Sequence, residues 1–128
     1  MILNKLIIQI SSAILFFLGT TNLIAQQESF INSLSKQQLL ALNKINDDNT
    51  DNNNSFKSTY SKSQRAIEKD KSLDRIAKKT AIRKTYSKSQ KEKKAANYEL
   101  YRNNMERFRN SLSESQKKLY DKHFNIQI

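Results

Sequence analysis

The sequence predicts an all-helical fold, and three observations lead to this class. The 128 residues contain no proline and one glycine, Gly19. A motif with Ser and Gln three residues apart recurs four times, and apolar residues recur at spacings of three and four. Sheet proteins depend on tight turns that Gly and Pro favour, whereas Ser-x-x-Gln begins helices. We therefore expect a small helical hairpin or bundle built from four repeats of about 26 residues.

The first 25 residues have the order of segments that is typical of a cleavable signal peptide. Lys5 precedes an apolar run at residues 6–18, and small and polar residues then lead to Ala25. A retained membrane anchor is the less favoured alternative, because a spanning helix needs about 20 apolar residues. We expect export to the periplasm or secretion, with a helical repeat domain at residues 26–128 and no membrane span after cleavage.

The repeat is a six-residue pattern, [ST]-[LY]-S-x-x-Q, that occurs four times. Its copies start at residues 33, 59, 85 and 111, so each start is 26 residues after the last. An apolar residue precedes each start by three positions: Phe30, Phe56, Ile82 and Phe108. Equal spacing of this kind indicates a repeated supersecondary unit.

Each copy of the pattern has the spacing of a capping box. The Ser side chain would accept a hydrogen bond from the Gln amide N–H, and the Gln side chain would accept one from the Ser amide N–H. Each copy would therefore begin a helix, and each cap would contribute about 0.5–2 kcal/mol. The predicted cap pairs are Ser35 with Gln38, Ser61 with Gln64, Ser87 with Gln90 and Ser113 with Gln116.

From each cap a helix can run about 20 residues, to the next copy of the pattern. The first helix is expected to end at Asp47, because residues 47–54 (DDNTDNNN) form an Asn- and Asp-rich segment that is typical of a loop. The second helix has the weaker apolar pattern, and the fourth is short. The third has an apolar stripe that crosses the fourth copy, so the last two helices could be fused there. The stripe consists of Tyr98, Tyr101, Met105, Phe108 and Leu112.

The sequence contains no convincing metal site. Acidic and amide residues alternate as in a calcium-binding loop at Asp47, Asn49, Asp51 and Asn53. This segment lacks the glycine of such a loop, and Ser58 occupies the place of the bidentate Glu, so a solvated loop is favoured. With His123 as its one histidine and no cysteine, the chain cannot build a usual zinc or iron site. We expect no metal and no cofactor.

Catalytic patterns are also missing from the sequence. No Gly-rich phosphate loop and no strand-turn-Ser nucleophile elbow is visible. We therefore expect the protein not to be an enzyme.

Positive charge is concentrated in the middle of the chain. The formal net charge is +11, and residues 57–94 contain 14 basic and 4 acidic residues, a net +10. Such a surface attracts unfolded or acidic polypeptides, or anionic envelope polymers. The alternative function is a structural or polyanion-binding surface module, whose ligands would be lipopolysaccharide, acidic polysaccharide or nucleic acid. Few aromatic residues lie among the basic ones, so we expect no specific nucleic-acid recognition. The plain alternative is a solvated basic face that maintains solubility. The basic residues predicted to bind are Lys78, Lys79, Arg83, Lys84 and Lys88.

Residues 34–38 (LSKQQ) and 112–116 (LSESQ) resemble the L-[TS]-x-x-Q signature of the Spy/CpxP family of periplasmic chaperones. The family typically has two such motifs, whereas this chain has four, with Tyr60 and Tyr86 in the place of Leu in two of them. The resemblance implies an ATP-independent chaperone and a curved antiparallel helical homodimer. It also implies a concave face that holds unfolded clients through apolar patches and positive charge.

This resemblance singles out the apolar residues around the four motifs as candidate client contacts. The alternative for each of them is a place in the hydrophobic core. The candidates are Phe30, Leu34, Phe56, Tyr60, Tyr86, Phe108 and Leu112.

Overall fold

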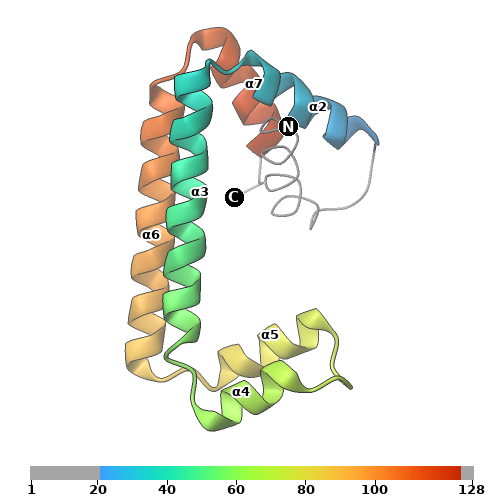
Figure 1. Ribbon diagram of the computed structural model, residues 1–128, viewed down its shortest axis with the longest axis vertical. Helices are drawn as coiled ribbons and strands as arrows, with labels where there is room; N and C mark the ends of the chain where they lie inside the picture. The colour runs from blue at the N-terminus through green and yellow to red at the C-terminus, as the bar shows by residue number, and fades with distance from the viewer. Residues whose placement is uncertain (1–20, 125–128) are drawn as a thin grey trace. The chain divides into compact units, whose positions relative to one another are not determined.

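A computed structural model describes residues 21–124, and within this range the chain forms helices joined by turns, without a strand (Figure 1). The all-helical prediction is therefore confirmed. None of the described helices combines the length and apolar character needed to cross a membrane. The helices are α2 (Thr21–Ser33), α3 (Lys36–Lys57), α4 (Lys62–Lys69), α5 (Arg75–Lys84), α6 (Lys88–Asn110) and α7 (Glu114–Phe124).

The predicted signal peptide falls largely outside the described residues. Residues 1–20 of the segment 1–25 are not among them, and the last five residues of that segment begin helix α2. The signal peptide and its cleavage site therefore stay predictions.

The chain divides into two compact units, which we name by their helices. The α3–α6 unit is Lys36–Ser111, and the α2–α7 unit combines, among the described residues, 21–35 with 112–124. In the α3–α6 unit, α3 and α6 lie side by side and antiparallel, and α4 and α5 form a hairpin (Figure 1). In the α2–α7 unit, α2 packs on α7. The buried apolar residues are Phe30, Leu42, Phe56, Ile82, Met105, Phe108, Leu112 and Tyr120.

The predicted loop at residues 47–54 is wrong, because the whole segment is helical and lies within α3. Helix α6 packs beside it and supplies partners for its polar groups. Asn97 Nδ2 donates to the backbone oxygen of Asn52 at 3.2 Å, and Lys94 Nζ donates to Asn53 Oδ1 at 2.9 Å. Asn and Asp each cost only about 0.7 kcal/mol relative to Ala in a helix, so these tertiary contacts are sufficient to override propensity. The calcium-loop alternation is likewise part of a helix.

The interval after the second motif contains two helices instead of one. Helix α4 ends at Lys69, and a turn at residues 70–74 precedes α5. Asp70 Oδ1 accepts hydrogen bonds from the backbone N–H and the hydroxyl of Ser72, and Asp74 caps α5 by accepting from Ala77 N–H at 2.8 Å. Aspartate side chains compete in this way with the helical backbone, which ends one helix and begins the next. The predicted fusion across the fourth motif does not occur, since α6 ends at Asn110 and α7 begins at Glu114.

The 26-residue period instead marks the joints between helices. At each motif start, a Ser or Thr hydroxyl donates to the backbone oxygen of the apolar residue three positions earlier, at 2.6–2.7 Å. This bond closes the end of the preceding helix, and a helix begins directly after the motif Ser two residues later. The four bonds are Ser33 to Phe30, Thr59 to Phe56, Thr85 to Ile82 and Ser111 to Phe108.

Candidate functional site

Capping boxes are present at the start of α4 and α6. Ser61 Oγ accepts from Gln64 N–H at 3.2 Å, and Ser61 N–H donates to Gln64 Oε1 at 2.9 Å. Ser87 and Gln90 make the same pair of bonds at 3.1 and 3.0 Å. At α7, Ser113 and Gln116 also bond reciprocally, at 3.2 and 3.0 Å. Helix α3 begins directly after Ser35 and includes Gln38.

Two of the motif glutamines also bind each other. Gln64 and Gln90 are 2% and 7% exposed, and each side-chain amide donates to the side-chain oxygen of the other, at 3.0 and 2.9 Å. Gln64 Nε2 also donates to the backbone oxygen of Thr85, and Gln90 Nε2 donates to that of Thr59. We call this pair the glutamine clasp. It joins the second and third motifs, and therefore the starts of α4 and α6.

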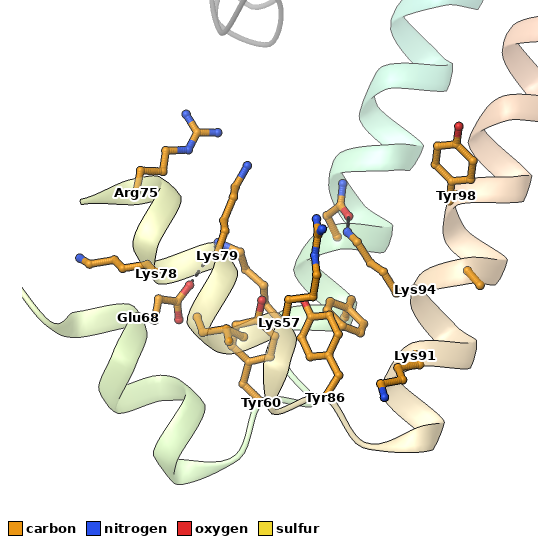
Figure 2. Close-up of a pocket in the computed structure, with 15 residues that line it drawn as sticks. Lys57, Tyr60, Glu68, Arg75, Lys78, Lys79, Tyr86, Lys91, Lys94 and Tyr98 are labelled. Carbon is orange, nitrogen blue, oxygen red and sulfur yellow. Dashed lines mark hydrogen bonds and ion pairs between the residues drawn. The ribbon is translucent and has the colours of Figure 1, made fainter. Parts of the chain in front are cut away.

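A pocket of about 830 Å³ opens in the same unit, between α3, α4, α5 and α6 (Figure 2). Its walls are strongly basic. Seven basic residues line it together with one carboxylate, Glu68, which gives a formal charge of +6. The basic residues are Lys57, Arg75, Lys78, Lys79, Arg83, Lys91 and Lys94.

Aromatic rings form the inner part of the pocket. Phe56 is 1% exposed and meets Tyr60 and Tyr86 edge to face, with ring centroids 5.8 and 5.2 Å away. Figure 2 shows Lys79 on α5 and Lys94 on α6, on opposite sides of Tyr60 and Tyr86. Burial raises the pKa of Tyr60, and its hydrogen bond with Tyr86 adds to the effect. The Tyr60 phenol is therefore a neutral group at physiological pH and keeps its proton.

The pocket cations are only partly compensated. Lys57 pairs with Glu68 at 3.2 Å. Lys94 donates to Asn53 and lies 5.3 Å from the centroid of Phe56, and its pKa is lowered by burial and by repulsion from neighbouring cations. Within residues 21–124, four pocket cations have no side-chain hydrogen bond or ion pair in the structure: Lys78, Lys79, Arg83 and Lys91.

Three of the five basic residues predicted to bind lie in this pocket, namely Lys78, Lys79 and Arg83. The other two, Lys84 and Lys88, are exposed but do not line it, and Lys88 pairs with Glu92 at 3.9 Å. Sequence reasoning did not single out the other four lining cations: Lys57, Arg75, Lys91 and Lys94. These come from three different helices, so only the three-residue spacing of the last two could have suggested a shared face.

The apolar residues predicted to contact clients are mostly buried. Phe30, Phe56, Phe108 and Leu112 are at most 5% exposed, so they lie in the hydrophobic core, and their contact with clients stays a prediction. Leu34, Tyr60 and Tyr86 are half-buried. The large apolar side chains that are exposed lie elsewhere, at Leu40, Ile76, Tyr98 and Leu100. Ile76, Tyr98 and Leu100 lie at least eight residues from the nearest motif, and Leu40 follows the first motif by two residues, whereas the predicted contacts lie within and before the motifs.

The single histidine belongs to the core of the α2–α7 unit. The His123 ring stacks on Phe30 with centroids 6.0 Å apart, and Tyr120 and Phe124 meet Phe30 edge to face. Neither ring nitrogen of His123 has a hydrogen-bond partner among the described residues, and burial lowers the pKa of the imidazole. The structure also shows no group of three His, Cys, Asp or Glu residues suited to a metal in the part of the chain that it describes.

Comparison with known protein families identifies one match. The family model described as "LTXXQ motif family protein" matches residues 24–124, which include all four copies of the pattern. This match confirms the resemblance to the Spy/CpxP signature. A comparison with curated proteins and a comparison with solved structures each give no match to the chain.

Proposed function

Because the chain belongs to the LTXXQ motif family, we propose that it is an exported, non-enzymatic, chaperone-like protein of the periplasm that binds unfolded polypeptides without nucleotide. The observation that carries the proposal is the combination, within one unit, of a large excess of positive charge with exposed apolar side chains. Family membership supports the class of activity, and this surface supports the way in which a client would be held.

The charge is distributed in a way that suits capture of a client. Residues 36–111 contain 19 basic and 9 acidic residues, so the α3–α6 unit carries +10 of the net +11. Long-range attraction of this kind increases the rate of encounter with acidic segments. Exposed side chains such as Leu40, Ile76 and Leu100 then offer separate, weak apolar contacts. Weak contacts release a client without an energy source.

The proposal is tested by light scattering of a chemically denatured protein diluted into buffer at low salt. Purified mature protein at stoichiometric concentration is expected to reduce the scattering. Replacing Ile76 and Leu100 by Ser should weaken this effect, whereas Asn103→Ser, at another exposed position of α6, should not. Unchanged aggregation with the wild-type protein would reject the proposal.

A second candidate function is binding of extended polyanions, such as lipopolysaccharide or acidic polysaccharide. It is favoured by the +6 charge of the pocket lining. A salt titration separates the two functions. Polyanion binding should weaken steeply as salt rises because it depends on counterion release, whereas client binding through apolar contacts should persist. Polyanion affinity that is indifferent to ionic strength would reject this candidate.

A further inference from the structure

The chain contains two copies of one pattern of sequence and helices along the chain, shifted by two 26-residue periods. Helices α2 and α3 correspond to α5 and α6, and α7 corresponds to α4. Gln116 Nε2 donates to the backbone oxygen of Ser33 at 2.7 Å, and Gln64 Nε2 donates to that of Thr85 at 3.2 Å. Because Ser33 and Thr85, like Gln64 and Gln116, are 52 residues apart, these two bonds are equivalent.

This correspondence shows what the fold requires at the pocket positions. The core positions are apolar in both copies: Ile82 corresponds to Phe30, and Phe56 corresponds to Phe108. Six of the seven cations of the pocket have uncharged counterparts in the other copy, and the seventh, Lys57, corresponds to Arg109. Arg83 corresponds to Ile31, Lys91 to Leu39, Lys94 to Leu42 and Lys79 to Gln27. Leu42, the counterpart of Lys94, is 1% exposed. An apolar residue is therefore accommodated at this position in the other copy. Helix formation and packing therefore do not explain the pocket cations.

The arrangement also carries an electrostatic cost that a solubility role would not explain. Cations that serve solubility can be spread over the whole exposed surface, where water and salt screen their repulsion. Here seven of them line one cavity with one carboxylate. Desolvation and repulsion from Lys79, Arg83 and Lys57 lower the pKa of Lys94. A bound anion would relieve this repulsion.

The chemistry of the pocket favours phosphate over carboxylate. A phosphate monoester carries roughly −1.5 to −2 charge and three acceptor oxygens, so a few adjacent phosphates match the formal +6 more closely than carboxylates do. Guanidinium groups such as Arg83 suit phosphate oxygens, and Tyr60 and Tyr86 add hydroxyl groups to the lining. The volume of about 830 Å³ is in the range of small-molecule sites.

We propose that the pocket between α3, α4, α5 and α6 is a binding site for a compact ligand with several phosphate groups, either a soluble oligophosphate or the diphosphorylated headgroup of a lipid. This binding goes beyond the holding of clients and does not depend on it. It also differs from attachment to a long polyanion, because it predicts one ligand per pocket and loss of affinity when the pocket cations alone are changed.

The experiment is isothermal titration calorimetry of the mature protein with inorganic tripolyphosphate, with citrate as the carboxylate probe. Tripolyphosphate is expected to bind with one-to-one stoichiometry and citrate at least tenfold more weakly. The variant Lys79→Gln/Lys91→Gln removes two exposed cations from the pocket. It should lower tripolyphosphate affinity by roughly tenfold or more, because two charged hydrogen-bond donors to phosphate are lost.

A matched control is Lys71→Gln/Lys118→Gln, which removes the same charge at two exposed positions outside the pocket. Its affinity should stay within about twofold of wild type, as expected for screened charges at a distance. Equal losses in the two variants, equal binding of citrate, or several weak sites per chain would each overturn the proposal.

Phosphatidylcholine vesicles with and without lipid A distinguish the two sources of phosphate. Binding only to vesicles that contain lipid A, lost in the pocket variant and kept in the control, would assign the site to a lipid headgroup. Binding of tripolyphosphate alone would assign it to a soluble ligand. Failure of both probes would overturn the site, whereas the aggregation assay reports on client binding independently.

Discussion

At the scale of single residues, the motif glutamines do more than cap. A capping box needs only the Gln side-chain oxygen, which accepts from the Ser N–H. In the glutamine clasp, the side-chain amides of Gln64 and Gln90 are used as well, each on the other Gln and on a backbone oxygen of the other motif. One side chain therefore begins its own helix and joins it to the start of another.

Replacing Gln64 or Gln90 by Ala should destabilise the protein more than a surface substitution does. Each replacement leaves buried partners without their hydrogen bonds, which costs about 1–3 kcal/mol. The measurement is the free energy of unfolding from urea denaturation followed by circular dichroism. The double variant should lose less than the sum of the two single losses, because the two side chains share their bonds.

The control for this prediction is Gln37→Ala, at an exposed position in the first turn of α3. It should change the free energy of unfolding by less than about 0.5 kcal/mol. Losses at Gln64 and Gln90 no larger than that, or strictly additive losses, would contradict the clasp.

His123 should make stability depend on pH near neutrality. Because burial lowers its pKa in the folded state, the unfolded chain takes up a proton first as the pH falls below the ordinary value of about 6.5. The contribution of the neutral ring is therefore present above that pH and is lost as the pH falls through the folded-state pKa. Urea denaturation at intervals between about pH 5 and 7.5 should show that the free energy of unfolding decreases as the pH is lowered.

The variant His123→Phe keeps an aromatic ring against Phe30 and removes the titrating group. Its stability should be nearly flat over the same interval, where carboxylates are already ionised. The interpretation is simple because the chain has one histidine. An equal pH dependence in the variant would show that another group is responsible.

Residue-scale features were predictable from the sequence where their partners are close along the chain. The caps at Ser61 and Ser87 follow from a spacing of three residues. The contact between Gln64 and Gln90 spans 26 residues, and the pocket collects lysines from α3, α5 and α6, so neither can be deduced without the fold. The motif predicted where helices begin, and tertiary packing decided which side chains meet.

At the scale of elements, α3 shows how packing overrides composition. Its Asn- and Asp-rich half has low helix propensity, yet it remains helical because α6 contacts it through Asn97, Lys94 and Lys93. The Thr50 hydroxyl also donates a hydrogen bond to the backbone oxygen of Asn46, one turn earlier in the helix. A reading based on local composition must miss this, since the stabilising partners lie about 40 residues further along the chain.

Asp51, which is exposed in the middle of that segment, distinguishes a helix from a loop. Asp51→Pro should destabilise the protein by about 3 kcal/mol or more, because proline removes a helical hydrogen bond and clashes with the preceding turn. Asp51→Ala is the control and should be neutral or stabilising by about 0.5 kcal/mol, since Ala is the better helix former. Both are measured by urea denaturation. Tolerance of proline would indicate a loop.

At the scale of the whole molecule, positive charge opposes folding. The α3–α6 unit carries a net +10, and several cations of its pocket have no ion-pair partner within the described residues. Self-repulsion of this kind destabilises the compact state and is weakened by salt. A protein that keeps such a cluster has lower stability at low ionic strength than its fold could reach.

This argument predicts that removing pocket cations stabilises the protein even as it removes ligand binding. In thermal denaturation at low ionic strength, the variant Lys79→Gln/Lys91→Gln should melt a few degrees above wild type, roughly the effect of 0.5–1 kcal/mol in a domain of this size. The advantage should shrink as salt is added, because screening already relieves the wild type. The matched variant Lys71→Gln/Lys118→Gln should gain less, since its cations lie outside the pocket. If the melting temperature of both variants rises equally, the repulsion is spread over the whole molecule. If neither melting temperature rises, repulsion among the pocket cations does not destabilise the protein.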